Sequence, residues 1–342
     1  MLKFAKKLVL LLIPSIIVTV LFFIFEPYNY FGFHKGADYM SKPLSSVREL
    51  LREQPENIIL GDSRMANLNT DLIKEASGDS YTMMAFGGAT LNDSINEFWY
   101  AAKHTKLKKV VWCVSFYLLN DNHSTDKFSL ILDTAENPAR YFLSYPYWEA
   151  AYKKLFASVS NGISDLTGNE SLLVASDDPS DYEHSSYTPS KETTEGYRSD
   201  LFDYSNIIYA QCVDYGGNLG YMHKLEEIAA YCDENGIELV FVLPPANGVI
   251  WDRVVYPLGI DFYINLYKDK LKSMATVYDM EFDNDYARND ENFWDGFHLS
   301  IPEKKRMIRT VFGDESDESC VVTSKEQYMA AQNAQQDAKT DN

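Results

Sequence analysis

The hydrophobic pattern alternates between short apolar runs and longer segments with helical periodicity through most of the chain. The apolar runs occupy residues 57–60, 81–85, 109–114, 237–243 and 276–278. The amphipathic segments between and after them occupy residues 45–54, 69–76, 91–103, 219–235, 261–274 and 302–311. Runs that are apolar at nearly every position are typical of parallel strands covered by helices on both faces. The pattern therefore predicts an α/β fold with a parallel sheet of about five strands flanked by helices.

Two segments break this rhythm. Residues 121–215 contain a helical pattern at Tyr147–Val159 but no clear strand, and such a length exceeds an ordinary connection, so we interpret them as an insertion. Within it, the Ser-, Asp-, Thr- and Pro-rich stretch 176–200 is compatible with a folded cover or with an unstructured surface excursion. Residues 313–342 are acidic and then rich in Gln and Ala, and we expect disorder beyond Cys320.

The chain opens with Lys3, Lys6 and Lys7, followed by 18 uncharged residues from Leu8 to Phe25. This run is just long enough to cross the hydrocarbon core of a bilayer. A cleaved signal peptide would need small residues after the run, which instead ends in Phe, Glu and Pro. A buried core helix rarely follows such a basic start. We therefore expect a single transmembrane signal anchor whose lysines stay in the cytoplasm.

This anchor divides the chain into parts. Residues 1–26 are the cytoplasmic stub and transmembrane helix, 27–55 a juxtamembrane linker rich in Tyr, Phe and Gly, and 56–312 the extracytoplasmic domain. The net charge is −19, and since the first 25 residues carry three positive charges and no acid, the remainder carries −22. Such a surface repels nucleic acid and anionic headgroups, so no nucleic-acid partner is expected.

The cysteines give no sign of a metal centre. None of Cys113, Cys212, Cys232 and Cys320 lies in a C-x-x-C pair, and no histidine cluster accompanies them, so we expect neither a metal nor a cofactor. Cys113 lies within an apolar run and is interpreted as core. Cys212 and Cys232 are the one pair considered for a disulfide, and no pairing is assigned.

The candidate chemistry begins where the first apolar run ends. Gly61, Asp62 and Ser63 follow this run directly, so Ser63 falls at the carboxyl end of a buried strand. The carboxyl ends of parallel strands open onto the binding crevice of an α/β sheet. A serine there is well placed to act as a nucleophile, although a Gly-Asp-Ser tripeptide is also common by chance.

A second informative stretch precedes the last helix. Asp295 and His298 are three residues apart in a turn, where a carboxylate can lie beside an imidazole. A serine needs such a pair to lose its proton near neutral pH. The alternative is an ordinary solvated turn. Together the two stretches predict a catalytic triad in which His298 deprotonates Ser63 and Asp295 orients His298.

These two stretches resemble the first and last motifs of the SGNH, or GDSL-like, hydrolase superfamily. Gly61-Asp62-Ser63 matches the first motif, and Asp295-Gly296-Phe297-His298 matches the last. The resemblance covers about 56–312 except the insertion, and it implies a flavodoxin-like parallel sheet and acyl-ester chemistry. The classical α/β-hydrolase elbow does not fit, because it would need glycine at Met65.

The family's second and third motifs supply the oxyanion hole. By resemblance we assign Gly88, with Gly87 as the neighbouring alternative, so that its amide and that of Ser63 face the developing oxyanion. The third motif would bring an asparagine directly after the third strand, but Asn120 comes several residues late. Either Asn120 still reaches the site, a hydroxyl of Tyr117 or Ser115 replaces it, or the site has two donors.

Arg64 directly follows the nucleophile. It either holds a carboxylate or phosphate of the substrate, together with Tyr117, or pairs with a neighbouring acidic residue.

An anchored domain of this kind resembles the single-pass SGNH-like proteins of bacterial cell-surface acylation, which work with a membrane-bound O-acyltransferase. The resemblance implies an extracytoplasmic acyltransferase or esterase that acts on acetyl or D-alanyl esters of envelope polysaccharide or teichoic acid through an acyl-Ser63 intermediate. A surface carbohydrate or lipid esterase is the alternative enzyme. A hypothesis of another class is a non-catalytic scaffold that holds a glycan for the partner enzyme.

Overall fold

The computed structural model describes the backbone of residues 2–33, 42–167, 194–216, 220–295 and 297–340. Side chains are described for residues 12–33, 43–160, 201–216, 220–295 and 297–337. The predicted excursion at 176–200 thus falls mostly outside the described residues.

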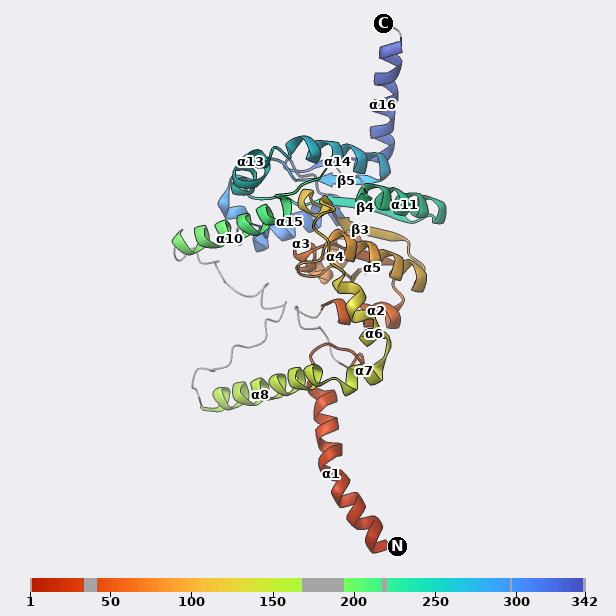
Figure 1. Ribbon diagram of the computed structural model, residues 1–342, viewed down its shortest axis with the longest axis vertical. Coiled ribbons are helices and arrows are strands. Elements are labelled where there is room, and N and C mark those ends of the chain that lie inside the picture. Colours follow the sequence, from red (N-terminus) through yellow and green to blue (C-terminus); the bar gives the residue numbers. More distant parts are fainter. Residues whose placement is uncertain (1, 34–41, 168–193, 217–219, 296, 341–342) are drawn as a thin grey trace.

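Six strands form a single sheet in the order β2-β1-β3-β4-β5-β6 (Figure 1). The strands are β1 (Asn57–Leu60), β2 (Thr82–Met83), β3 (Lys109–Cys113), β4 (Glu238–Leu243), β5 (Thr276–Asp279) and β6 (Val321–Thr323). The first five pair in parallel, which confirms the predicted α/β class. β1 lies between β2 and β3, so the chain connections on its two sides run in opposite directions along the sheet. Ligands of open α/β sheets bind at such a switch point, and the segment after β1 lies next to it.

Helices cover both faces of this sheet. Alternate residues of β1 point to opposite sides, so Ile58 and Leu60 join one core cluster and Ile59 joins the other. The first face packs against α2 (Lys42–Glu53), α5 (Leu91–His104), α11 (Gly220–Asn235) and α14 (Asp261–Met274). The second packs against α3 (Ser63–Ala66), α4 (Thr70–Ser77) and α15 (Ile301–Phe312).

The described parts of the predicted linker, residues 27–33 and 42–55, pack on the domain. Tyr30 of this segment and Leu44, Val47 and Leu50 of α2 are buried in the main core. The folded domain therefore begins well before residue 56, because α2 supplies an apolar face that the sheet needs on that side.

The insertion at 121–215 is mostly helical where it is described, and η2 (Phe116–Leu119) precedes it. It contains α6 (Lys127–Glu136), α7 (Pro138–Leu143), α8 (Tyr145–Thr167) and α10 (Thr194–Cys212). Between β4 and β5 lie the short turns α12 (Gly248–Ile250), η3 (Trp251–Val255) and α13 (Tyr256–Leu258), and η4 (Asp290–Asn292) precedes α15.

The prediction of disorder beyond Cys320 is wrong. β6 pairs antiparallel with β5, with Val322 opposite Tyr278, and α16 (Lys325–Thr340) follows it. The β-branched residues 321–323 form a strand because the outer edge of β5 offers unpaired backbone groups, which the polar composition of the tail does not reveal.

The first helix, α1 (Leu2–Phe25), projects from the domain at the end opposite α16 (Figure 1). Within the part of the chain that the structure describes, no helix is both long and apolar enough to cross a membrane.

Candidate active site

The nucleophile turn is shaped by two residues before Ser63. Gly61 has φ +136, and a Cβ added there would lie 2.5 Å from the Cβ of Cys113, so only glycine allows β3 to approach this turn. Asp62 caps the short helix α3, and its side chain accepts a hydrogen bond of 2.9 Å from the amide of Arg64. Ser63 is consequently fixed at the first position of α3.

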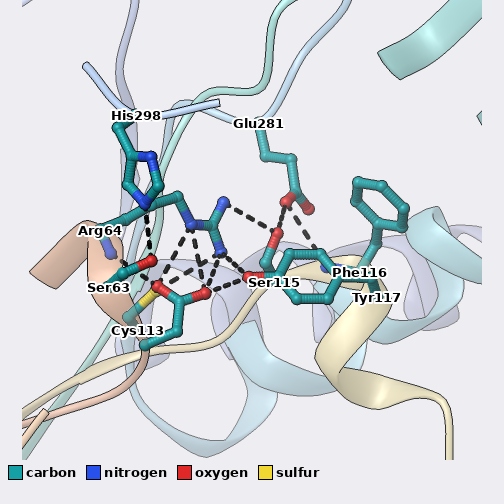
Figure 2. A network of polar contacts seen from close by, with 9 residues as sticks. Ser63, Arg64, Cys113, Ser115, Phe116, Tyr117, Glu281 and His298 are labelled. Atoms are coloured by element: carbon teal, nitrogen blue, oxygen red, sulfur yellow. Dashed lines mark hydrogen bonds and ion pairs between the residues drawn. The ribbon is translucent and has the colours of Figure 1, made fainter. Parts of the chain in front are cut away.

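The three predicted triad residues are brought together. Ser63 Oγ lies 2.6 Å from His298 Nε2 (Figure 2), and His298 Nδ1 lies 2.7 Å from Asp295 Oδ2. Because a carboxylate can only accept, Nδ1 carries the proton and Nε2 is left to accept the proton of Ser63. Hydrogen bonds connect the three side chains in the order that a general base requires.

The turn that carries His298 is held by its own backbone. Asp295 Oδ1 accepts hydrogen bonds from the amides of Phe297 and His298, at 2.9 and 2.8 Å. Burial raises the pKa of Asp295, but the bonds from His298 and the two amides outweigh it, so the pKa lies below its ordinary value. A bridge between Phe293 and Leu299 closes the turn. Asp295 is therefore an ionised and oriented partner for His298.

Gly87 and Gly88 form an exposed turn after β2. The amide of Phe86 donates to the carbonyl of Gly61 at 3.2 Å, which ties this turn to the nucleophile turn. Among the described residues, the amides of Ser63, Gly87 and Gly88 have no protein acceptor. Such amides are available to bind an oxyanion.

The predicted third donor is engaged elsewhere. Asn120 is buried, and its Nδ2 donates to the carbonyl of Gln211 in α10 at 2.6 Å. Asn120 thus fastens the insertion to the loop after β3. The hydroxyls considered as replacements are also bonded to protein groups, Tyr117 to Asp62 and Ser115 to Glu281.

Arg64 is buried directly beneath the nucleophile. Its guanidinium pairs with Asp62 at 3.0 Å and donates to Tyr117 Oη at 3.2 Å and to Ser115 Oγ at 3.3 Å (Figure 2). Burial raises the pKa of Asp62, but the charge of Arg64 together with the hydrogen bonds from Arg64 and Tyr117 outweighs burial and lowers the pKa overall. With only 3% of its side chain exposed, Arg64 takes the structural role that was the alternative to substrate binding.

The network continues to a residue that the sequence analysis missed. Glu281 accepts a hydrogen bond from Ser115, and its backbone carbonyl accepts one from Lys268, which pairs with Asp279 at 2.8 Å. Burial raises the pKa of Glu281 to about 7, against the opposing charges of Lys268 and Arg64. Its position just beyond the carboxyl end of β5, the edge where parallel strands place functional groups, was the available signal.

Part of the insertion lies beside the triad. Tyr204 of α10 stacks on Phe297, with ring centroids 5.6 Å apart and planes at 11°, and meets the ring of His298 edge-on at 5.5 Å. The centroid of the Phe297 ring also lies 4.8 Å from the guanidinium carbon of Arg64. Aromatic rings therefore cover the imidazole on the insertion side.

In the described ranges, no three His, Cys, Asp or Glu side chains are grouped so that they could hold a metal ion. All four cysteines are free thiols, so Cys212 and Cys232 are not paired.

No protein-family model matches the chain, and a search of curated proteins finds no match to it.

Proposed function

We propose that the protein is a serine-dependent acyltransferase or esterase that works through an acyl-Ser63 intermediate. The observation that carries the proposal is the continuous series of hydrogen bonds from Ser63 Oγ through His298 to Asp295. The motif resemblance to the SGNH superfamily and the parallel α/β sheet agree with it. A buried ion pair under the nucleophile gives the serine turn a fixed geometry, which nucleophilic catalysis requires.

In the first half-reaction, Ser63 Oγ attacks the acyl carbonyl while His298 Nε2 takes its proton. The amides of Ser63 and Gly88 stabilise the oxyanion, and His298 then returns the proton to the leaving oxygen. In the second half, His298 deprotonates an acceptor hydroxyl, which attacks the acyl-Ser63 carbonyl. The proton on His298 then goes to Ser63 Oγ as the ester bond breaks, so the enzyme is restored.

The acceptor decides between transfer and hydrolysis. If the hydroxyl belongs to a glycan the protein is a transferase, and if it belongs to water it is an esterase. The rings of Tyr204 and Phe297 beside His298 favour transfer, because they reduce the access of water to the base. The charge of −22 outside the first 25 residues favours a neutral envelope polysaccharide over a polyanionic teichoic acid.

We also propose that α1 anchors the domain on the outer face of a cell membrane, next to a membrane-bound O-acyltransferase as partner. The run from Leu8 to Phe25 carries no charge and follows three lysines. Along α1, Ile16, Ile17, Val20 and Ile24 are all exposed, as expected for a helix surrounded by lipid.

The test is the intact mass of the full chain in detergent after treatment with a fluorophosphonate, and separately with p-nitrophenyl acetate. Wild type should gain one phosphonyl adduct and Ser63→Ala none, while Ser158→Ala, a surface control, should behave as wild type. Acetate release that accelerates when a glycan is added would indicate transfer.

The side-chain amide of Asn120 is hydrogen-bonded to Gln211 and so does not serve as an oxyanion donor. This favours one other candidate function, a scaffold that binds glycan without turnover. That function requires that wild type form no adduct and that Ser63→Ala bind glycan as tightly as wild type.

A further inference from the structure

Helix α8 is joined to both the domain and α1 by aromatic contacts. The ring of Tyr147 packs on Tyr141, with centroids 4.5 Å apart, and on Tyr28 at 5.4 Å. The next residue, Trp148, packs on Phe22 of α1 at 4.3 Å. The start of α8 is therefore held at the junction where α1 leaves the domain.

Helical periodicity fixes how α8 continues beyond this junction. Phe156 follows Tyr147 by nine residues, which is two and a half turns, so it lies on the opposite face from the one that meets the domain. Val159 follows Trp148 by eleven residues, or about three turns, and continues the face that meets α1. Tyr152, four residues after Trp148, lies on this same face at a centroid distance of 6.1 Å.

The face of α8 that carries Phe156 and Val159 has exposed apolar side chains beside an ion pair between Glu149 and Lys153. Phe156 is 65% exposed and Val159 50%. Other large apolar side chains are exposed where α1 leaves the domain, namely Phe33, Leu143 and Tyr145. Figure 1 shows α8 running across the direction of α1 from the place where α1 meets the domain. Exposed apolar side chains are thus present on α1, at the end of α7 and on α8.

We propose that α7 and the described part of α8 lie in the headgroup region of the bilayer that α1 enters. The inference rests on the proposed anchoring of α1. Lipid is the occupant because the face lies next to α1, whose run from Leu8 to Phe25 carries no charge, and because Tyr and Trp gather at this junction, as at membrane interfaces. Lys153 pairs with Glu149 at 2.9 Å on α8, so these two charges offset each other.

Contact of α7 and α8 with the bilayer attaches the domain to the membrane at a second place, in addition to α1. A lone helix lets the domain tilt and rotate about its junction, whereas an in-plane helix fixes its inclination to the bilayer. The domain then presents the Ser63 site at a constant height above the membrane, as an acyl donor bound in the membrane requires.

The test uses the full chain reconstituted in phosphatidylcholine vesicles, with the photoreactive residue p-benzoylphenylalanine placed singly at four positions. Phe156 and Val159 lie on the proposed lipid face. Ser158 is exposed on the same helix but lies eleven residues after Tyr147, on the domain side. Ile17 reports on α1. After irradiation, mass spectrometry identifies each adduct as phospholipid or protein.

We expect phospholipid adducts at Ile17, Phe156 and Val159, with yields at the last two at least about fivefold above that at Ser158. Lipid adducts at Ile17 but not above the Ser158 level on α8 would overturn this inference and leave the anchor standing. Adducts of Phe156 with a second copy of the chain would overturn it too. Absence of lipid adducts at Ile17 would refute the anchor and this inference together.

Discussion

Ser63 Oγ and His298 Nε2 lie 2.6 Å apart although the residues are separated by 235 positions in the sequence. The first parallel strand positions one residue, and the turn before α15 positions the other. Since each belongs to a different end of the domain, their contact depends on the whole sheet being assembled.

Changing Asp295 to Asn should reduce acyl-enzyme formation by about 10³- to 10⁴-fold, because an amide no longer fixes Nδ1–H and cannot stabilise the imidazolium. His298→Gln should reduce it at least as much, since the base is lost. Stopped-flow release of p-nitrophenol measures both. Activity within a few-fold of wild type in either variant would show that the triad does not operate.

Gly88→Ala should lower kcat by about 10²-fold with little change in KM, because φ +68 is unfavourable for alanine and the oxyanion amide moves. Gly78→Ala is the matched control. It has φ +78 at the end of α4, with nothing within 4 Å of the added Cβ. Steady-state kinetics should show normal turnover for Gly78→Ala, and equal losses in both variants would contradict the assignment of Gly88.

Arg64→Met should destabilise the protein by about 3–5 kcal/mol, because it leaves Asp62 buried without its charge partner. Removing both charges with Asp62→Asn and Arg64→Met should recover much of that loss. Arg52→Met breaks an exposed pair with Glu53 and should cost about 0–1 kcal/mol. Urea unfolding followed by circular dichroism compares them. A loss for Arg64→Met as small as that for Arg52→Met would argue against the network.

Glu281 should make stability depend on pH. Its folded pKa of about 7 exceeds the ordinary 4.5, so the folded state holds a proton that the unfolded state releases. The contribution of Glu281 to the free energy of unfolding is full below pH 4.5. It falls by on the order of 3 kcal/mol as the pH rises to about 7. Unfolding free energies at pH 5 and 8 should therefore differ less in Glu281→Gln than in wild type. Parallel profiles would show that Glu281 does not titrate in this range.

Tyr204→Ala should open His298 to water and raise the ratio of hydrolysis to transfer several-fold in the presence of a glycan acceptor. Tyr209→Ala removes a 40% exposed ring from the same helix and should leave the ratio unchanged. Product analysis by mass spectrometry gives the ratio directly. Equal ratios in wild type and Tyr204→Ala would mean that this ring does not exclude water.

The sequence was sufficient for the sheet and the triad because both depend on local signals. Runs that are apolar at nearly every position favour a parallel sheet covered by helices, and Ser63, Asp295 and His298 each stand in a short motif beside a strand or helix end. The rule that the carboxyl ends of parallel strands share one edge places Ser63 at the crevice, and the turn before α15 brings His298 to it.

The buried network and β6 could not be predicted in the same way. Arg64 and Glu281 are charged residues that the sequence gives no reason to bury, and only their partners in the fold make burial tolerable. The strand at 321–323 is short and is defined by the open edge of β5. The orientation of the Asn120 side chain depends on its hydrogen bond to α10. The position of α10 depends in turn on the fold of the insertion.

The placement of the insertion between β3 and β4 also affects how the chain folds. The strands β1, β2 and β3 are close in sequence and can pair early, whereas β4 must first close a loop that contains the whole insertion. Until then the apolar strand β3 presents an unpaired edge, and such edges invite pairing with other chains. We therefore expect the yield of folded protein to depend on how fast this loop closes relative to aggregation through β3.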